Sequence, residues 1–85
     1  MDRRELIRRT TAVIDQLAWR LPPETVQGVR DMADAGEEGE AISEIVAALA
    51  TRRDSVTEVE RTELAALMAA MNLDTDALDQ LNVQP

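Results

Sequence analysis

The sequence predicts an all-α protein: a compact bundle of four helices followed by a short fifth helix at the C-terminal end. Three observations support this fold class. Residues with high helix propensity dominate the 85-residue chain, and 45% of its residues are apolar, which is enough for a core. The apolar residues recur at three- and four-residue steps, which places them on one side of a helix. The β-branched residues form no alternating run, so the sequence gives a sheet little support.

The first two helices are separated by a pair of prolines. The first helix is expected to begin at Asp2, a favourable N-cap, and to end near Arg20. The Pro22-Pro23 pair stops it, because proline disfavours helical geometry in the residue before it. The second proline suits the first turn of a second helix, which should end near Ala35. Gly36 follows as the C-terminal stop, so the corner to the next helix must be tight.

The third and fourth helices are separated by a clear loop. The third helix is expected over residues 37–51, and residues 52–55 form the loop. Thr57 and Glu60 then have the spacing of a capping box, in which each side chain bonds the other residue's backbone N–H. The fourth helix is therefore expected to begin there and to run to about Met71.

The C-terminal segment predicts one more short helix. Asp74 or Thr75 can cap it, and it should reach about Leu81, with Leu78 and Val83 also turned inward. No repeat and no long linker interrupts the chain, so residues 1–85 are expected to form a single domain.

The charge of the chain restricts its partners. The formal net charge is −8, from 17 acidic and 9 basic residues, and every basic residue is arginine. Such a field repels phosphate backbones and anionic membranes, so we expect neither nucleic acid nor a membrane as a partner; it attracts basic partners. Without a long apolar segment or a signal-peptide core, the chain is expected to be cytoplasmic.

The residue types also argue against catalysis. The chain has no His, Cys or Lys, so neither Ser43 nor Ser55 has a basic residue to activate it. The glycines follow no strand and make no phosphate cradle. We therefore expect no enzyme activity, no catalytic residue, no cofactor and no metal, although a site built only from carboxylates stays conceivable. Asp54-Ser55-Val56 resembles the phosphopantetheine-accepting serine of acyl carrier proteins, but the helix predicted almost up to Ser55 favours ordinary loop residues.

Six carboxylates between residues 31 and 44 suggest a binding surface. A helical wheel places Asp31 and Asp34 opposite the apolar stripe of the second helix, and Glu37, Glu40 and Glu44 opposite that of the third. The tight corner joins the two acidic faces into one negative surface. A solvated face usually mixes charges of both signs, whereas here only Arg30 and Arg52-Arg53 are near enough to compensate. We interpret the surface as a docking site for a basic partner, with a merely solvated face as the alternative. The candidate partner-binding residues are Asp31, Asp34, Glu37, Glu38, Glu40 and Glu44.

The only aromatic residue, Trp19, lies almost opposite the apolar stripe of the first helix. We expect it to pack under Pro22-Pro23 or under a C-terminal segment; an exposed Trp19 would be a candidate interface anchor. Leucines and methionines of the fourth helix, from Leu64 to Met71, are expected to belong to the core and not to a partner groove.

Three stretches resemble the small helical immunity proteins of bacterial toxin–immunity systems, of the MafI type and the related contact-dependent inhibition type. One is Leu21-Pro22-Pro23-Glu24 followed by a short helix. The second is the Gly-Glu turn of residues 35–42, with the small Ala41 on the next helix. The third is the capped helix of residues 56–73 with its closing segment, residues 78–83.

This resemblance implies a protein that neutralises a cognate secreted toxin, often a nuclease, in competition between bacteria. A nuclease site is basic because it binds phosphates, so an acidic helical surface suits it. The alternative is a helical adaptor or regulatory module, with self-association through the fourth helix as one form of it. The oligomeric state stays open at this point.

Overall fold

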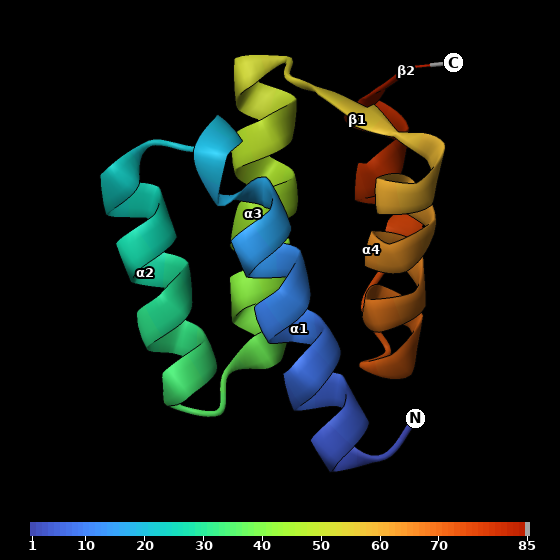
Figure 1. Ribbon diagram of the computed structural model, residues 1–85. Helices are drawn as coiled ribbons and strands as arrows, with labels where there is room; N and C mark the ends of the chain where they lie inside the picture. The colour runs from blue at the N-terminus through green and yellow to red at the C-terminus, as the bar shows by residue number, and fades with distance from the viewer. Residues whose placement is uncertain (85) are drawn as a thin grey trace.

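The computed structural model describes residues 1–84 and is a small all-α bundle, which confirms the predicted fold class (Figure 1). The four α-helices are α1 (Arg3–Leu17), α2 (Pro23–Asp34), α3 (Glu38–Arg52) and α4 (Glu58–Ala70). Two 3-10 segments accompany them: η1 (Ala18–Arg20) continues α1, and η2 (Thr75–Gln80) stands where the short fifth helix was predicted.

Local sequence signals set the helix ends, as expected. The side chain of Asp2 accepts a hydrogen bond from the Glu5 N–H at 2.8 Å and so caps α1. The predicted capping box opens α4: the Glu60 N–H donates to Thr57 Oγ1 at 3.1 Å, and the Thr57 N–H donates to Glu60 Oε1 at 2.9 Å. After α2, Gly36 turns the chain with φ of +82°, a conformation that glycine adopts without strain.

The core surrounds α3, which lies behind α1 with α2 on one side and α4 on the other (Figure 1). Its apolar stripe is fully buried, and α3 packs against α1, α2, α4 and η2. The stripe of α4 also belongs to this core, as predicted, apart from the half-buried Met71. The largest fully buried apolar side chains are Leu17, Val29, Ile42, Ile45, Val46, Leu49, Val56, Leu64, Leu67 and Leu78.

A short two-stranded sheet corrects the prediction that residues 52–55 are a plain loop. Strand β1 (Ser55–Thr57) pairs in parallel with β2 (Asn82–Gln84), and Val56 lies opposite Val83. Val56 is fully buried, and the Asn82 side chain donates to the Arg53 carbonyl oxygen at 3.1 Å. Three-residue strands are too short to produce an alternating pattern in the sequence. They are recognised only in the tertiary structure, where the C-terminal segment pairs with residues 55–57.

Candidate protein-binding surface

Five of the six predicted partner-binding carboxylates lie exposed around one corner of the bundle. Helices α2 and α3 run side by side and are joined by a short turn (Figure 1). Backbone hydrogen bonds close this turn, among them one from the Glu37 N–H to the Met32 carbonyl oxygen at 2.8 Å. The five exposed carboxylates, hereafter the acidic surface, are Asp31 and Asp34 of α2, Glu37 of the turn, and Glu40 and Glu44 of α3.

The sixth residue, Glu38, is not part of the surface, so its prediction as a contact residue is wrong. Its side chain is only 3% exposed, and Arg3 Nη2 of α1 lies 3.0 Å from its Oε1 atom. That oxygen accepts no hydrogen bond from residues 1–84, but the nearby guanidinium charge offsets the cost of burying its negative charge. The helical wheel of α3 already places Glu38 on the apolar stripe, three, four and seven residues before Ala41, Ile42 and Ile45. The tertiary structure adds its partner, because Arg3 reaches it from the start of α1.

The acidic surface carries no compensating positive charge. The ion pairs among residues 1–84 number seven, and none includes a member of the acidic surface. Two of the arginines that the sequence offered have other partners: Arg30 binds Asp15 at 2.8 Å, and Arg52 binds Asp54 at 2.9 Å. The third, Arg53, caps the C-terminal end of α3, away from the corner, and forms no ion pair among residues 1–84. Within the surface, only Asp31 accepts a side-chain hydrogen bond, from Gln27 at 2.9 Å.

Interaction with the helix dipole makes the positions of some carboxylates in the acidic surface favourable for stability, but not those of others. Glu37 and Glu40 stand at the N-terminus of α3, where the positive end of the dipole stabilises negative charge. Asp31 and Asp34 stand in the last turn of α2, where the dipole is negative and no basic residue is present. Their position therefore lowers the stability of the fold, so stability does not account for them.

A shallow hollow gives the acidic surface an apolar edge. It encloses about 560 Å³ beside Glu40 and Glu44, and its other sides come from Met32 of α2 and from small or apolar residues. The remaining lining residues are Gly39, Ser43, Ala47 and Leu73. A partner that pairs its basic groups with the two glutamates can therefore also bury apolar side chains next to them.

No family model, curated protein or solved structure matches this chain. Residues 1–84 include no helix that is both long and apolar enough to cross a membrane. In the same residues, no three carboxylates come together in a group that could hold a metal ion. The function proposed for the chain therefore depends on the charge and geometry of its own surfaces.

A second surface was not predicted from the sequence. Trp19 is 76% exposed, so the expectation that it packs against other residues is wrong. Trp19 lines a hollow together with Arg20, Arg52, Asp54, Ser55 and Gln84. A separate groove lies between α1 and α4, and Val59 in its lining is also 76% exposed. The position of Trp19 opposite the apolar stripe of α1 was the only signal in the sequence, because the groove forms only where two distant helices meet.

Proposed function

We propose that this chain is an immunity protein that binds a cognate toxin domain of basic charge, such as a nuclease, and neutralises it in the cell that produces both. The acidic surface of Asp31, Asp34, Glu37, Glu40 and Glu44 is the proposed contact. The observation that carries the proposal is that these five exposed carboxylates share one corner and none of them has an ion-pair partner among residues 1–84.

The chemistry of a nuclease explains why such a surface would inhibit it. A nuclease presents positive charge where it holds the phosphates of its substrate, so a rigid array of carboxylates can occupy or cover that site. Charge attraction also speeds the encounter, which matters for capturing a toxin before it acts. The two aspartates at the negative end of α2 support this proposal, because they weaken the helix and are favourable only beside positive charge.

The decisive experiment has two arms. In the first, this chain is co-expressed with the product of the adjacent gene, and the toxicity and activity of that product are measured with and without the chain. Co-purification together with loss of activity supports an immunity protein. Binding without any loss of activity would instead favour an adaptor or regulatory module and would refute neutralisation.

In the second arm, two charge reversals of equal net charge are compared. Glu40→Arg with Glu44→Arg changes the acidic surface, whereas Glu24→Arg with Asp76→Arg changes exposed, unpaired carboxylates elsewhere. Glu24 and Asp76 both stand in the first turn of a helix, whereas Glu40 does and Glu44 does not, so the control pair should cost at least as much helix stability as the test pair. We expect the first pair to weaken binding roughly 10- to 100-fold and the control pair to change it far less. Equal losses would show that only net charge matters, and the acidic surface would be rejected as the contact.

A further inference from the structure

A second hollow extends the one beside Glu40 and Glu44 along α3. The first encloses about 560 Å³ and the second about 300 Å³, and Ser43, Ala47 and Leu73 line both of them. The two hollows therefore form one continuous groove, hereafter the α3 groove. It begins beside α2, follows the exposed side of α3 and ends beside η2, and its lining is mostly apolar.

The floor of the α3 groove is made of small residues. Gly39, Ser43, Ala47 and Ala50 recur at three- and four-residue steps, so they share one face of α3 and let another backbone approach closely. The fold does not require a glycine there, because a Cβ atom at Gly39 would meet its nearest neighbours at 3.7 and 3.9 Å, which is ordinary contact. Glycine also lowers helix stability relative to alanine. Internal packing therefore leaves the depth of this groove unexplained.

The charge beside the α3 groove is of one sign. Glu40 and Glu44 line the first hollow and Asp74 lines the second, and all three are exposed. None of them forms an ion pair among residues 1–84, and none of the described residues in the lining is basic. An occupant that complements the groove must therefore carry positive charge as well as an apolar surface.

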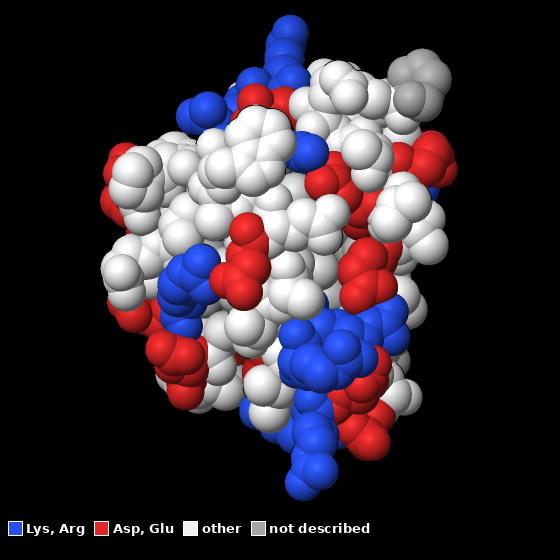
Figure 2. All heavy atoms as spheres, in the orientation of Figure 1, with Lys and Arg blue, Asp and Glu red and all other residues white. Residues whose placement is uncertain are grey.

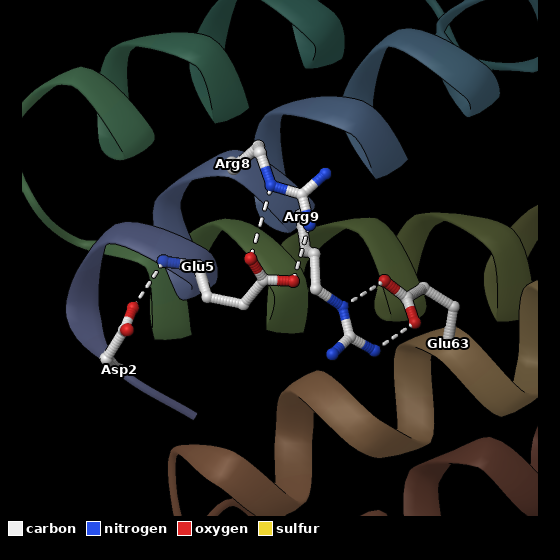
Figure 3. Close-up of polar contacts among 5 residues, drawn as sticks. All are labelled: Asp2, Glu5, Arg8, Arg9 and Glu63. Carbon is white, nitrogen blue, oxygen red and sulfur yellow. Dashed lines mark hydrogen bonds and ion pairs between the residues drawn. The ribbon is translucent and has the colours of Figure 1, made fainter.

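The charges beside the groove between α1 and α4 are mostly paired. Two of the three glutamates in its lining, Glu60 and Glu63, bind arginines. Figure 3 shows Arg9 binding Glu63 across the two helices, with Arg9 Nε 2.8 Å from Glu63 Oε2, and Arg8 binding Glu5 along α1. Figure 2 views the molecule from the side of α1, where basic and acidic groups lie next to each other. That side of the molecule therefore attracts a charged partner less than the α3 groove does.

The hollow beside Trp19 is compensated in the same way. The guanidinium of Arg20 lies 4.7 Å from the centre of the indole ring, and it donates hydrogen bonds to Glu60 and, at 3.0 Å, to the Ser55 carbonyl oxygen. The other arginine of that hollow, Arg52, has an acidic partner as well. Of the three places, only the α3 groove is bordered by carboxylates none of which has an ion-pair partner among residues 1–84.

An α-helix is the kind of segment that such a lining accepts. An extended segment would need a hydrogen-bond partner for each buried backbone N–H and C=O group, and the strands β1 and β2 line neither hollow. A helix satisfies its own backbone groups and can lay an apolar face into a groove. From Gly39 to Ala50 the floor is roughly 17 Å long, which corresponds to about three helical turns.

We propose that the α3 groove binds an amphipathic, basic helix of the partner protein. The apolar face of that helix lies on Met32, Ala47 and Leu73, and its arginines or lysines stand at the edges of this face beside the unpaired carboxylates. The identity of the partner as a toxin domain rests on the proposed function, whereas the class of segment that the groove accepts is tested separately from it.

Ala47→Leu tests the groove without changing any charge. Ala47 is exposed and lines both hollows, so a leucine there fills the space of the bound helix and keeps a high helix propensity. Ala12→Leu is the matched control. Ala12 is also exposed, stands equally far from the N-terminal end of a helix of the same length, and lines the α1–α4 groove instead. Circular dichroism and thermal unfolding check that both variants are folded.

The first arm uses two synthetic peptides of about 15 residues, built from alanine, leucine and arginine. One has its leucines on a single helical face, and the other has the same composition with the leucines distributed around the helix. Fluorescence anisotropy of labelled peptides at physiological salt measures the affinity. We expect the amphipathic peptide to bind roughly tenfold more tightly than its isomer and to gain helicity, and Ala47→Leu to abolish the difference while Ala12→Leu preserves it. No binding, equal binding of the two peptides, or binding that Ala47→Leu leaves unchanged overturns the proposal.

The second arm measures binding and neutralisation of the adjacent gene product by the wild type and both variants. A loss of affinity of roughly tenfold or more that is confined to Ala47→Leu supports the helix in the α3 groove. If Ala47→Leu binds and neutralises as well as the wild type, or if Ala12→Leu is impaired equally, the groove proposal is overturned and neutralisation stands. If the wild type does not bind that product at all, the proposed function fails, and the peptides still decide what the groove accepts.

Discussion

The guanidinium of Arg20 donates hydrogen bonds to both carboxylate oxygens of Glu60, at 2.7 and 3.0 Å, and so ties η1 to the first turn of α4. The same carboxylate accepts the Thr57 N–H and completes the capping box. Burial by itself would raise the pKa of Glu60, but the hydrogen bonds from Thr57 and Arg20 together outweigh it and lower the pKa below the usual value. One side chain therefore links the helix cap, the strand β1 and the orientation of Trp19.

The lowered pKa of Glu60 predicts a loss of stability in acid. In the unfolded chain a glutamate titrates near pH 4.3, so the stabilisation is fully present above that pH and disappears as the pH falls through the lower pKa of the folded state. The pKa of Glu63 is lowered as well, chiefly by the hydrogen bond from Arg9, and adds in the same direction. Urea unfolding at a series of pH values measures this effect.

Glu60→Gln should isolate this contribution. At neutral pH we expect the variant to lose about 3 kcal/mol of unfolding free energy, because Arg20 is left without its charged partner. The difference from the wild type should shrink as the pH falls towards the lowered pKa of Glu60 in the folded state, where the wild-type carboxyl also becomes neutral. Glu44→Gln is the control at an exposed carboxylate without an ion pair among residues 1–84. If the difference in stability stayed constant with pH, the ionised carboxylate of Glu60 would not be its source.

Asp34→Asn should stabilise the protein and weaken its binding at the same time. Asp34 is the last residue of α2, and removal of its charge from the negative end of the dipole should add about 0.3–1 kcal/mol. Glu24→Gln, in the first turn of the same helix, should change stability with the opposite sign. Thermal unfolding at low salt measures both variants. If Asp34→Asn stabilised the fold but left affinity for the basic partner intact, Asp34 would not belong to the contact.

Two glycines should respond in opposite ways to alanine. Gly28 lies within α2, and a Cβ atom there meets no atom within 4 Å, so Gly28→Ala should add about 0.4–1 kcal/mol by restricting the unfolded chain. Gly36 has φ of +82°, and a Cβ atom would come within 3.3 Å of Arg3 Nη2. Gly36→Ala should therefore destabilise the corner by about 1 kcal/mol or more. Denaturant unfolding distinguishes the two, and a gain in stability at Gly36 would contradict the turn geometry.

Thr10→Val should stabilise the core. Thr10 is fully buried on α1, and its hydroxyl oxygen has no hydrogen-bond partner among residues 1–84. An unpaired buried hydroxyl costs about 1–3 kcal/mol, and valine has nearly the same shape without that group. We expect the midpoint of urea unfolding to rise at an unchanged slope. Thr11→Val, at the exposed neighbouring position, is the matched control and should change stability little.

Much of the fold could be predicted because its determinants are local. Asp2, the two prolines, Gly36 and the Thr57 capping box each act within a few residues of their own position, and the helices begin and end where these signals stand. The positions of most exposed carboxylates followed equally well from the 100° step of the helix, because a charged side chain opposite an apolar stripe faces water.

The parts that were missed depend on residues far apart in the chain. Glu38 lies on the buried stripe of α3, which periodicity could have shown, but its ion pair with Arg3 depends on α1. Strand β1 exists because the C-terminal segment returns beside it. Trp19 stays exposed because nothing in residues 1–84 covers it, while Arg20 holds its ring. Periodicity and capping act within one helix and therefore determined the elements and the charge of their outer faces. The tertiary structure decided which charges are paired and where a groove opens, because those outcomes depend on which helices meet.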